Sequence, residues 1–208
     1  MLTTDQFLGF LATAILLTLT PGPDNLMVLS LGMAHGRLRG IAFGLGCALG
    51  CLSHTLLAVI GVSALIAASP VAFTALRVAG GLYLAWMGWH ALRSRGGARV
   101  DGAAVPATPP RTLFFKGMLA NAINPKVALF FLSFLPQFVV AGRGDATLQI
   151  GLLGLAFTAQ AALVFALLGA CSGAIGAWLA RRPRAGVWLD RVAGAVFLGL
   201  GLRLIVAR

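Results

Sequence analysis

The sequence predicts an all-α integral membrane protein with six transmembrane helices, arranged as a 3+3 inverted repeat in which the first and fourth helices are broken. Three observations lead to this prediction. Of the 208 residues, 59% are hydrophobic and only 10% are charged, whereas a soluble domain carries about 25% charged residues. The apolar residues form six long segments separated by short polar turns. Prolines interrupt the first and fourth segments near their middles, where they should break a helix.

We expect the six apolar segments to cross the membrane, because a crossing helix needs roughly 20 residues. In chain order the segments cover residues 7–32, 40–68, 71–92, 113–140, 147–178 and 185–206. The fifth segment is longer than a crossing requires, so we expect it to be tilted, bent or partly outside the bilayer. The chain then divides into a first three-helix repeat (residues 1–92), a basic cytoplasmic linker (residues 93–112) and a second repeat (residues 113–208).

The distribution of positive charge predicts the orientation. Sixteen Lys and Arg face five acidic residues, all of them Asp, which gives a net charge of +11. In a soluble protein this excess would suggest nucleic acid as a partner. Here the basic residues concentrate in alternate connections between apolar segments, which indicates that those connections are cytoplasmic. We therefore expect the lipid bilayer and no nucleic acid as a partner, with both termini outside the cytoplasm.

The two interruptions point to a site. Each half has three spans, so the two halves insert with opposite orientations. Paired broken helices in corresponding positions are typical of a transporter whose substrate site lies near the bilayer midplane. Irregular backbone at that depth is tolerated only where protein buries it or where it lines a cavity.

The first interruption places an acidic residue at the start of a half-helix. Gly22 is expected to cap that helix and Pro23 to be its first residue, so Asp24 and Asn25 fall in its first turn. In water, an acidic residue there would merely complement the helix dipole. In a membrane interior a carboxylate is costly and rare, which favours a functional role for Asp24.

The second interruption repeats the arrangement with a basic residue. Asn124 is expected to be the cap, Pro125 the first helical residue and Lys126 the second. A lysine at a helix N-terminus opposes the dipole and so needs a carboxylate partner or an anionic ligand. The alternative is that Lys126 extends along the helix toward the membrane surface.

An amino acid carries both an ammonium and a carboxylate group, so it would suit a site that contains both Asp24 and Lys126. We expect Asp24 and Lys126 to face one polar cavity, close enough to pair directly or through water or substrate. Asp24 could bind an ammonium group, and Lys126 and the free N–H groups of the two half-helices could hold a carboxylate. Burial disfavours a charged carboxylate, so Asp24 is also a candidate for proton coupling. Further hydrogen bonds could come from Thr20, Gly22, Asn25, Asn121 and Gln160, although polar side chains can equally join one helix to another.

These motifs resemble those of the LysE/RhtB family of amino-acid exporters. The resemblance rests on Thr20-Pro21-Gly22-Pro23, on the glycine-rich second segment, and on Asn124-Pro125-Lys126 followed by an apolar run to Leu135-Pro136-Gln137-Phe138. It implies a bacterial inner-membrane efflux carrier for amino acids or related small metabolites, driven by the proton-motive force. The chain is more similar to the RhtB (homoserine/threonine) branch. The implied partners are a small zwitterion and protons, and a homodimer is left open.

Cys47, Cys51 and His54 support a second interpretation. They are spaced i, i+4 and i+7, so they share one helix face, and thiolate and imidazole ligands suit a soft metal. Some relatives in the wider superfamily are associated with cadmium resistance or reducing equivalents, so a membrane redox or metal-handling protein is the alternative. Small packing residues beside glycines would give the same pattern. We see no phosphate loop and no nucleophile–base group, and expect neither an enzyme nor a cofactor.

Overall fold

The computed structural model describes residues 2–62, 69–94, 108–140 and 142–206, which are helical with no strand among them. The α-helices are α1 (Thr4–Leu19), α2 (Pro23–His35), α3 (Arg37–Leu57), α5 (Pro70–Arg93), α6 (Pro110–Ala122), α7 (Pro125–Leu129), α8 (Ala146–Ala170), α9 (Ser172–Arg181) and α10 (Pro183–Val206). A π-helical turn, η1 (Ala58–Val62), continues α3. The π-helical turn η2 (Phe130–Phe134) and the 3-10 turn η3 (Leu135–Phe138) continue α7.

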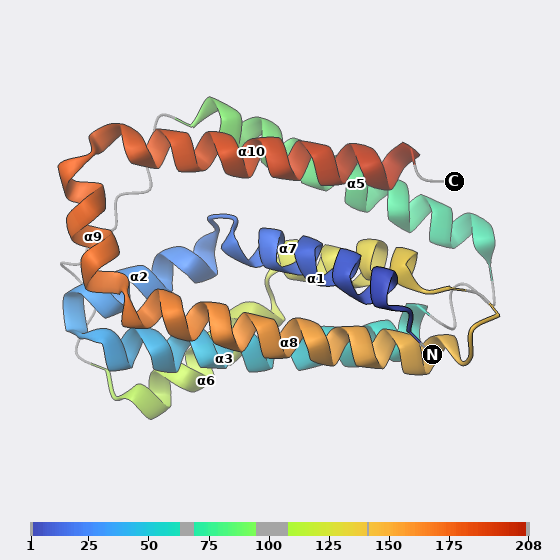
Figure 1. Cartoon of the computed structure of the whole chain (residues 1–208), viewed down its shortest axis with the longest axis horizontal. Helices are drawn as coiled ribbons and strands as arrows, with labels where there is room; N and C mark the ends of the chain where they lie inside the picture. Colours follow the sequence, from blue (N-terminus) through green and yellow to red (C-terminus); the bar gives the residue numbers. More distant parts are fainter. Residues whose placement is uncertain (1, 63–68, 95–107, 141, 207–208) are drawn as a thin grey trace.

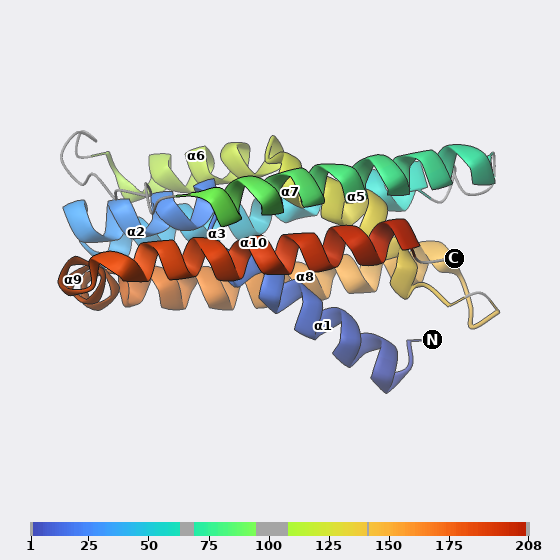
Figure 2. The ribbon, with the colours of Figure 1, turned by 90° about the horizontal axis from the view of Figure 1, so that it is seen from above.

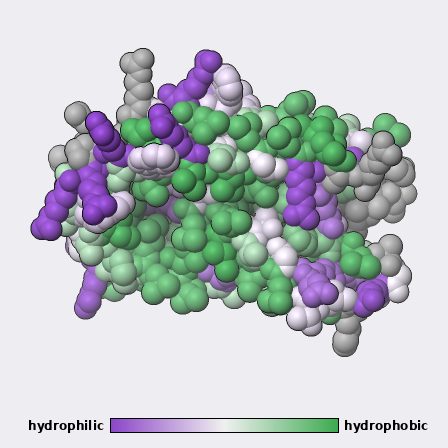
Figure 3. Space-filling view, turned by 45° about the horizontal axis from the view of Figure 1, so that its top comes forward, coloured by the Kyte–Doolittle hydropathy of each residue, from purple (hydrophilic) through white to green (hydrophobic). Residues whose placement is uncertain are grey.

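The predicted membrane-embedded, all-helical class is confirmed. Three single helices, α3, α5 and α8, are long and apolar enough to cross a membrane. The bent pair α1–α2 and the bent pair formed by α6 with α7–η3 bring the number to five. The predicted sixth span corresponds to α10, which has 24 residues but is not among these candidates. Hydrophobic side chains cover the middle of the molecule, and hydrophilic ones concentrate toward its two ends (Figure 3).

Both predicted interruptions are present. The chain bends by 56° between α1 and α2 and by 49° between α6 and α7, and Figure 2 shows α1 slanting away from the direction of the other long helices. Gly22 and Asn124 are the N-caps of α2 and α7, and a proline is the first residue of each helix, where its missing N–H costs no hydrogen bond. The prolines therefore set both break positions through local backbone chemistry.

The broken helices lie in the middle of the molecule. Figure 1 shows α1, α2 and α7 between a pair formed by α5 and α10 and a group formed by α3, α6 and α8. The α5–α10 pair is antiparallel and tightly packed. A Cβ atom on Gly88 would lie 2.7 Å from the carbonyl oxygen of Gly194, and one on Gly81 would lie 2.9 Å from that of Gly201. Small residues thus allow the outer helices to approach closely around the two breaks.

The fifth segment, residues 147–178, is divided between two helices, which agrees with the expectation that so long a segment could be bent. Helix α8 ends at Ala170, and α9 then runs across the end of the bundle (Figure 1). The Ser172 hydroxyl donates to the carbonyl of Gly169 at 2.8 Å, which satisfies one of the carbonyls left free at the end of α8. The region predicted as a linker lies between α5, which ends at Arg93, and α6, which begins at Pro110, and residues 95–107 are outside the described residues.

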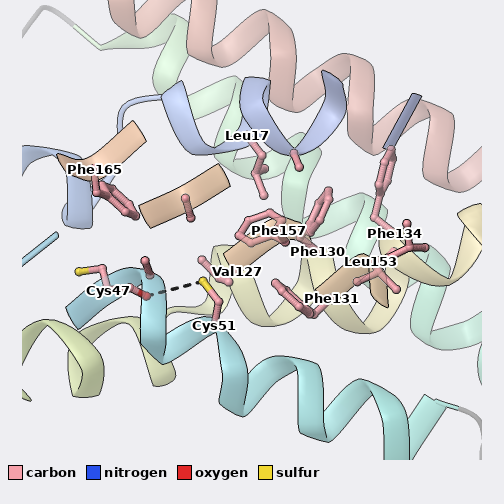
Figure 4. Packing of buried hydrophobic residues seen from close by; sticks show 14 of the residues in the cluster. Leu17, Cys47, Cys51, Val127, Phe130, Phe131, Phe134, Leu153, Phe157 and Phe165 are labelled. Atoms are coloured by element: carbon pink, nitrogen blue, oxygen red, sulfur yellow. Dashed lines mark hydrogen bonds between the residues drawn. The ribbon is translucent and has the colours of Figure 1, made fainter. Parts of the chain in front are cut away.

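An aromatic cluster fills the bundle beside the second break. Phe130, Phe131, Phe134 and Phe157 are buried, and their rings lie to one side of Val127 in Figure 4. The rings of Phe131 and Phe157 have centroids 4.9 Å apart, and those of Phe130 and Phe134 are stacked at 5.3 Å. This rigid packing, typical of a protein interior, fixes the position of α7.

A hydrogen-bonded group lies beyond the aromatic cluster. The side-chain amide of Gln6, near the start of α1, donates to the carbonyl of Phe138 and, at 3.0 Å, to the side-chain oxygen of Gln149. Gln149 also bonds both the N–H and the carbonyl of Val140, at 3.1 and 3.2 Å. The starts of α1 and α8 are therefore tied to the end of η3.

Candidate functional site

Asp24 is held by the second break. It is the second residue of α2 and is only 5% exposed. Its Oδ2 atom accepts hydrogen bonds from the side-chain amides of Asn121 (2.8 Å) and Asn124 (3.0 Å). Asn121 belongs to the last turn of α6 and Asn124 caps α7, so both donors come from the other interrupted span. Two carboxamide donors stabilise a carboxylate that is almost completely buried.

Lys126 is held by the first break. It is the second residue of α7, is 3% exposed, and its Nζ donates to the carbonyls of Leu17 (3.3 Å) and Thr20 (3.2 Å). These carbonyls lie at the C-terminal end of α1, where helix carbonyls lack partners and the dipole is negative. The carbonyls at the end of α1 therefore stabilise the buried positive charge of Lys126, a role that was expected of a carboxylate or an anionic ligand.

Gly22 makes room for the lysine. A Cβ atom at this position would lie 3.0 Å from the Nζ of Lys126, closer than such atoms normally approach. The backbone of Gly22 is extended, with φ of −162°, so its small size and not its backbone conformation is what the site uses. Gly22 thus caps α2, and because it has no side chain it leaves space for the Lys126 ammonium to reach the carbonyls at the end of α1.

Asp24 and Lys126 line one small cavity but do not pair directly. No ion pair joins these two described residues within 4.0 Å. The cavity has room for about one water molecule (≈ 10 Å³). Its other lining residues are Leu17, Thr18, Cys51, Asn121, Val127, Phe157 and Phe165. The shared cavity predicted from the sequence is present, and direct pairing is not.

Thr18 links two further predicted residues to this cavity. The side-chain amide of Asn25 donates to the Thr18 carbonyl at 2.8 Å, and that of Gln160 donates to the Thr18 hydroxyl at 2.9 Å. The Thr18 hydroxyl itself donates to the carbonyl of Ala14, so it can only accept from Gln160. The side-chain oxygens of Asn25 and Gln160 are buried and accept no hydrogen bond from the described residues. Neither residue lines the cavity itself, but Thr18, to which both amides donate, does.

Thr18 was not among the residues predicted from the sequence, whereas Thr20 was, and the two threonines use different atoms near the first break. Thr18 lies in the last turn before the first break, which is the one signal that could have singled it out. The Thr20 hydroxyl donates back to the carbonyl of Leu16 at 2.6 Å and is not directed at the cavity. Thr20 reaches the site through its backbone carbonyl, an atom that every residue carries.

The residues of the redox alternative pack against Asn121. The thiol of Cys51 contacts the Asn121 side-chain oxygen at 3.4 Å, and a ring nitrogen of His54 lies 2.9 Å from the Asn121 carbonyl. Cys47 is fully buried on the same face of α3. Within the described ranges, no three His, Cys or Asp side chains are grouped to hold a metal ion. These contacts orient the amide that holds Asp24 and do not favour a metal centre.

The fold and the site together define a polytopic membrane transporter, in which two interrupted helices meet at a buried, charged cavity. The chain belongs to the LysE type translocator family, which it matches over residues 15–208. A threonine efflux protein of Escherichia coli (strain K12) is 31% identical in an alignment that covers 97% of this chain and 98% of the relative. This family assignment confirms the resemblance noted in the sequence and the expectation of a transporter and not an enzyme.

Other relatives extend the comparison. A membrane protein of Pseudomonas aeruginosa, described as uncharacterized, is 30% identical over 97% of this chain and 95% of its own length. A leucine efflux protein of Enterobacter sp. is 34% identical over 138 residues, which is 64% of each chain. No solved structure matches this chain.

Proposed function

We propose that this protein is a secondary active exporter of amino acids in a bacterial inner membrane, driven by the proton-motive force. The observation that carries the proposal is that Asp24 and Lys126, at the second positions of two half-helices, line the same buried cavity. Opposite charges at one small site suit a zwitterion. The relatives named for threonine and leucine efflux point to neutral amino acids as the substrates.

The ammonium of the substrate binds on the Asp24 side of the cavity. An ammonium group has three N–H donors and needs three acceptors. Asp24 supplies a carboxylate, and the buried side-chain oxygens of Asn25 and Gln160 are acceptors without donors among the described residues. Both amides are fixed in orientation by Thr18, because their nitrogens must face its carbonyl and its hydroxyl. In the proposed mechanism, movement of the half-helices brings these two oxygens to the substrate ammonium.

The carboxylate of the substrate binds on the Lys126 side. Without substrate, the Lys126 ammonium donates to the carbonyls of Leu17 and Thr20. When substrate binds, the ammonium can donate to the substrate carboxylate instead, so it keeps its hydrogen-bond acceptors. The N-terminal N–H groups of α2 and α7 add dipoles of the sign that an anion requires. Asp24 is then also the group that exchanges a proton, since substrate and proton compete for one carboxylate.

Binding requires the half-helices to separate. The cavity has room for about one water molecule, so an amino acid cannot enter it without movement of the elements around it. The aromatic cluster of Phe130, Phe131, Phe134 and Phe157 closes one side, and the bonds of Gln6 and Gln149 lie beyond it. In the proposed alternating-access cycle, these contacts form the extracytoplasmic gate.

The proposed architecture is a 3+3 inverted repeat of residues 1–92 and 113–208 with both termini outside the cytoplasm. Corresponding outer helices of the two halves are neighbours: α5 packs antiparallel to α10, and α3 contacts α8. Each break also holds the charged residue of the other half-helix, which is what a pseudo-twofold axis near the cavity would produce. The linker of residues 93–112 would be cytoplasmic in this arrangement.

Transport by purified protein tests the proposal. Inside-out proteoliposomes should accumulate radiolabelled threonine or leucine when their interior is more acidic than the outside medium. A protonophore should abolish the accumulation. Threonine amide keeps the ammonium but lacks the carboxylate, so it should not compete. Efficient competition by the amide, or transport indifferent to the gradient, would contradict the carboxylate site or the coupling respectively.

A further inference from the structure

A groove separate from the transport site lies between α9 and α10. Its volume is about 570 Å³. It is lined by Trp178, Arg182, Arg184, Ala185, Trp188, Leu189 and Val192. Helix α9 crosses the end of the bundle and α10 runs along it (Figure 1), so the groove lies toward that end of the molecule.

The groove has a basic end. Arg182 and Arg184 are exposed, and the Arg182 guanidinium lies 5.6 Å from the centre of the Trp178 ring. Asp190 is the acidic residue of α10, and it accepts a 2.6 Å hydrogen bond from the Ser94 hydroxyl. Asp24, the acidic residue of α2, is buried in the transport site. In the described parts of α2, α9 and α10, no acidic side chain therefore neutralises Arg182 or Arg184.

The rest of the groove is apolar and faces outward. Trp188 is 63% exposed, Leu189 41% and Val192 59%, although all three belong to a helix of a membrane-embedded bundle. Tryptophan side chains favour the depth of the lipid headgroups, and aliphatic side chains favour the acyl chains. The groove therefore changes from cationic to apolar along α10, as a phospholipid changes along its own length.

We propose that the groove binds one anionic diacyl phospholipid, with its phosphate on Arg182 and Arg184 and an acyl chain against Trp188, Leu189 and Val192. Guanidinium groups bind phosphate oxygens through paired hydrogen bonds, and basic pockets between membrane helices suit anionic headgroups. A second copy of this chain is a poorer occupant, because a net charge of +11 would bring like charges together. Free phosphate would leave the apolar part of the groove uncovered.

Lipid binding by the full-length protein tests this inference. Native mass spectrometry of the detergent-solubilised wild type, supplied with phosphatidylglycerol, should show one retained lipid. The same lipid should raise the melting temperature, whereas phosphatidylcholine and inorganic phosphate should not. Arg182→Ala/Arg184→Ala should lose most of the bound lipid and most of the thermal shift.

Two further variants separate the groove from general charge and from folding. Arg111→Ala/Lys116→Ala removes the same charge from exposed positions of α6 and should bind lipid like the wild type. Val192→Trp fills the apolar part of the groove, keeps both arginines and should also reduce lipid retention. Equal retention by the wild type and the Arg182/Arg184 variant would overturn the proposal. So would a thermal shift that phosphate alone reproduces, or a mass showing a second copy of the chain in place of the lipid.

Discussion

Asp24 and Lys126 are each held by the break that belongs to the other. The Asp24 carboxylate, at the start of α2, accepts hydrogen bonds from the asparagines that flank the second break. The Lys126 ammonium, at the start of α7, donates to carbonyls that end α1 at the first break. The two charges share a cavity without touching, so any movement that separates the breaks must release both charges together.

Removing either charge should strongly reduce export. Asp24→Asn keeps the shape but loses charge-assisted hydrogen bonds, each worth about 1.5–3 kcal/mol, so we expect transport to fall by about 10- to 100-fold or more. Lys126→Met also leaves the Leu17 and Thr20 carbonyls unpaired, so it should lower the melting temperature as well. Initial transport rates and thermal unfolding of both purified variants measure these effects. Normal transport by either variant would rule out its role in the site.

The double variant tests whether the charges compensate each other at a distance. An uncompensated charge in a membrane interior costs at least about 2.5–3.5 kcal/mol on insertion scales. Asp24→Asn/Lys126→Met leaves no net charge, so it should express and melt better than Lys126→Met alone while remaining inactive. Strictly additive losses of stability in the double-mutant cycle would show that the two charges do not interact.

Asn124 has two separable tasks. Its side-chain oxygen accepts from the Lys126 N–H at 3.0 Å to cap α7, while its amide donates to Asp24. Asn124→Asp keeps the cap acceptor but places a second carboxylate against Asp24, whereas Asn124→Ser keeps a cap without that charge. We expect transport to be lost in the Asp variant and only reduced in the Ser variant. Equal transport by both would show that contact with Asp24 is unimportant.

Gly22 offers a steric test. In Gly22→Ala the added methyl group would meet the Lys126 ammonium at 3.0 Å and displace it from the carbonyls of α1. The extended backbone accepts alanine, so the fold should persist while transport falls several-fold. Gly199→Ala is the matched control, because a Cβ atom there meets nothing within 4 Å. Substrate titrations of both variants measure the effect, and unchanged transport in Gly22→Ala would contradict the proposed position of the lysine.

The parts of the site that the sequence could predict are those governed by local rules. Proline lacks an N–H and glycine lacks a Cβ, so the two breaks, their caps and the positions of Asp24 and Lys126 could be located without a structure. The class of fold followed from hydropathy, because a bilayer imposes a minimum length on each apolar segment. These features depend on residues within a few positions of one another.

The partners of Lys126 could not be predicted in the same way. They are backbone carbonyls, which every residue carries, and only the packing of α7 against the end of α1 selects those of Leu17 and Thr20. The position of the turn from α8 to α9 could not be predicted either, because Cys171 and Ser172 interrupt the apolar pattern only weakly. The hydroxyl of Ser172 and the close contact of Gly32 with it become visible only in three dimensions.

The proposed topology makes its own prediction. With Cys47, Cys51 and Cys171 replaced, a single cysteine introduced as Ala98→Cys in the linker should resist an impermeant thiol reagent on intact spheroplasts. The same cysteine should react in inside-out vesicles, which controls for its accessibility. Rapid labelling in spheroplasts would place the linker outside the cytoplasm and would refute the proposed orientation.

The cysteines of α3 distinguish an exporter from a redox or metal-handling protein. The Cys51 thiol makes a 3.4 Å contact with the Asn121 side chain, and serine can supply a hydroxyl donor in its place. We therefore expect Cys47→Ala/Cys51→Ser to export threonine at close to the wild-type rate. Asn121→Ala removes the amide that donates to Asp24 at 2.8 Å, so it should lose transport and serves as the matched control. If the cysteine variant lost transport while its melting temperature was unchanged, the thiols themselves would be required and the exporter mechanism proposed around Asp24 and Lys126 would be incomplete.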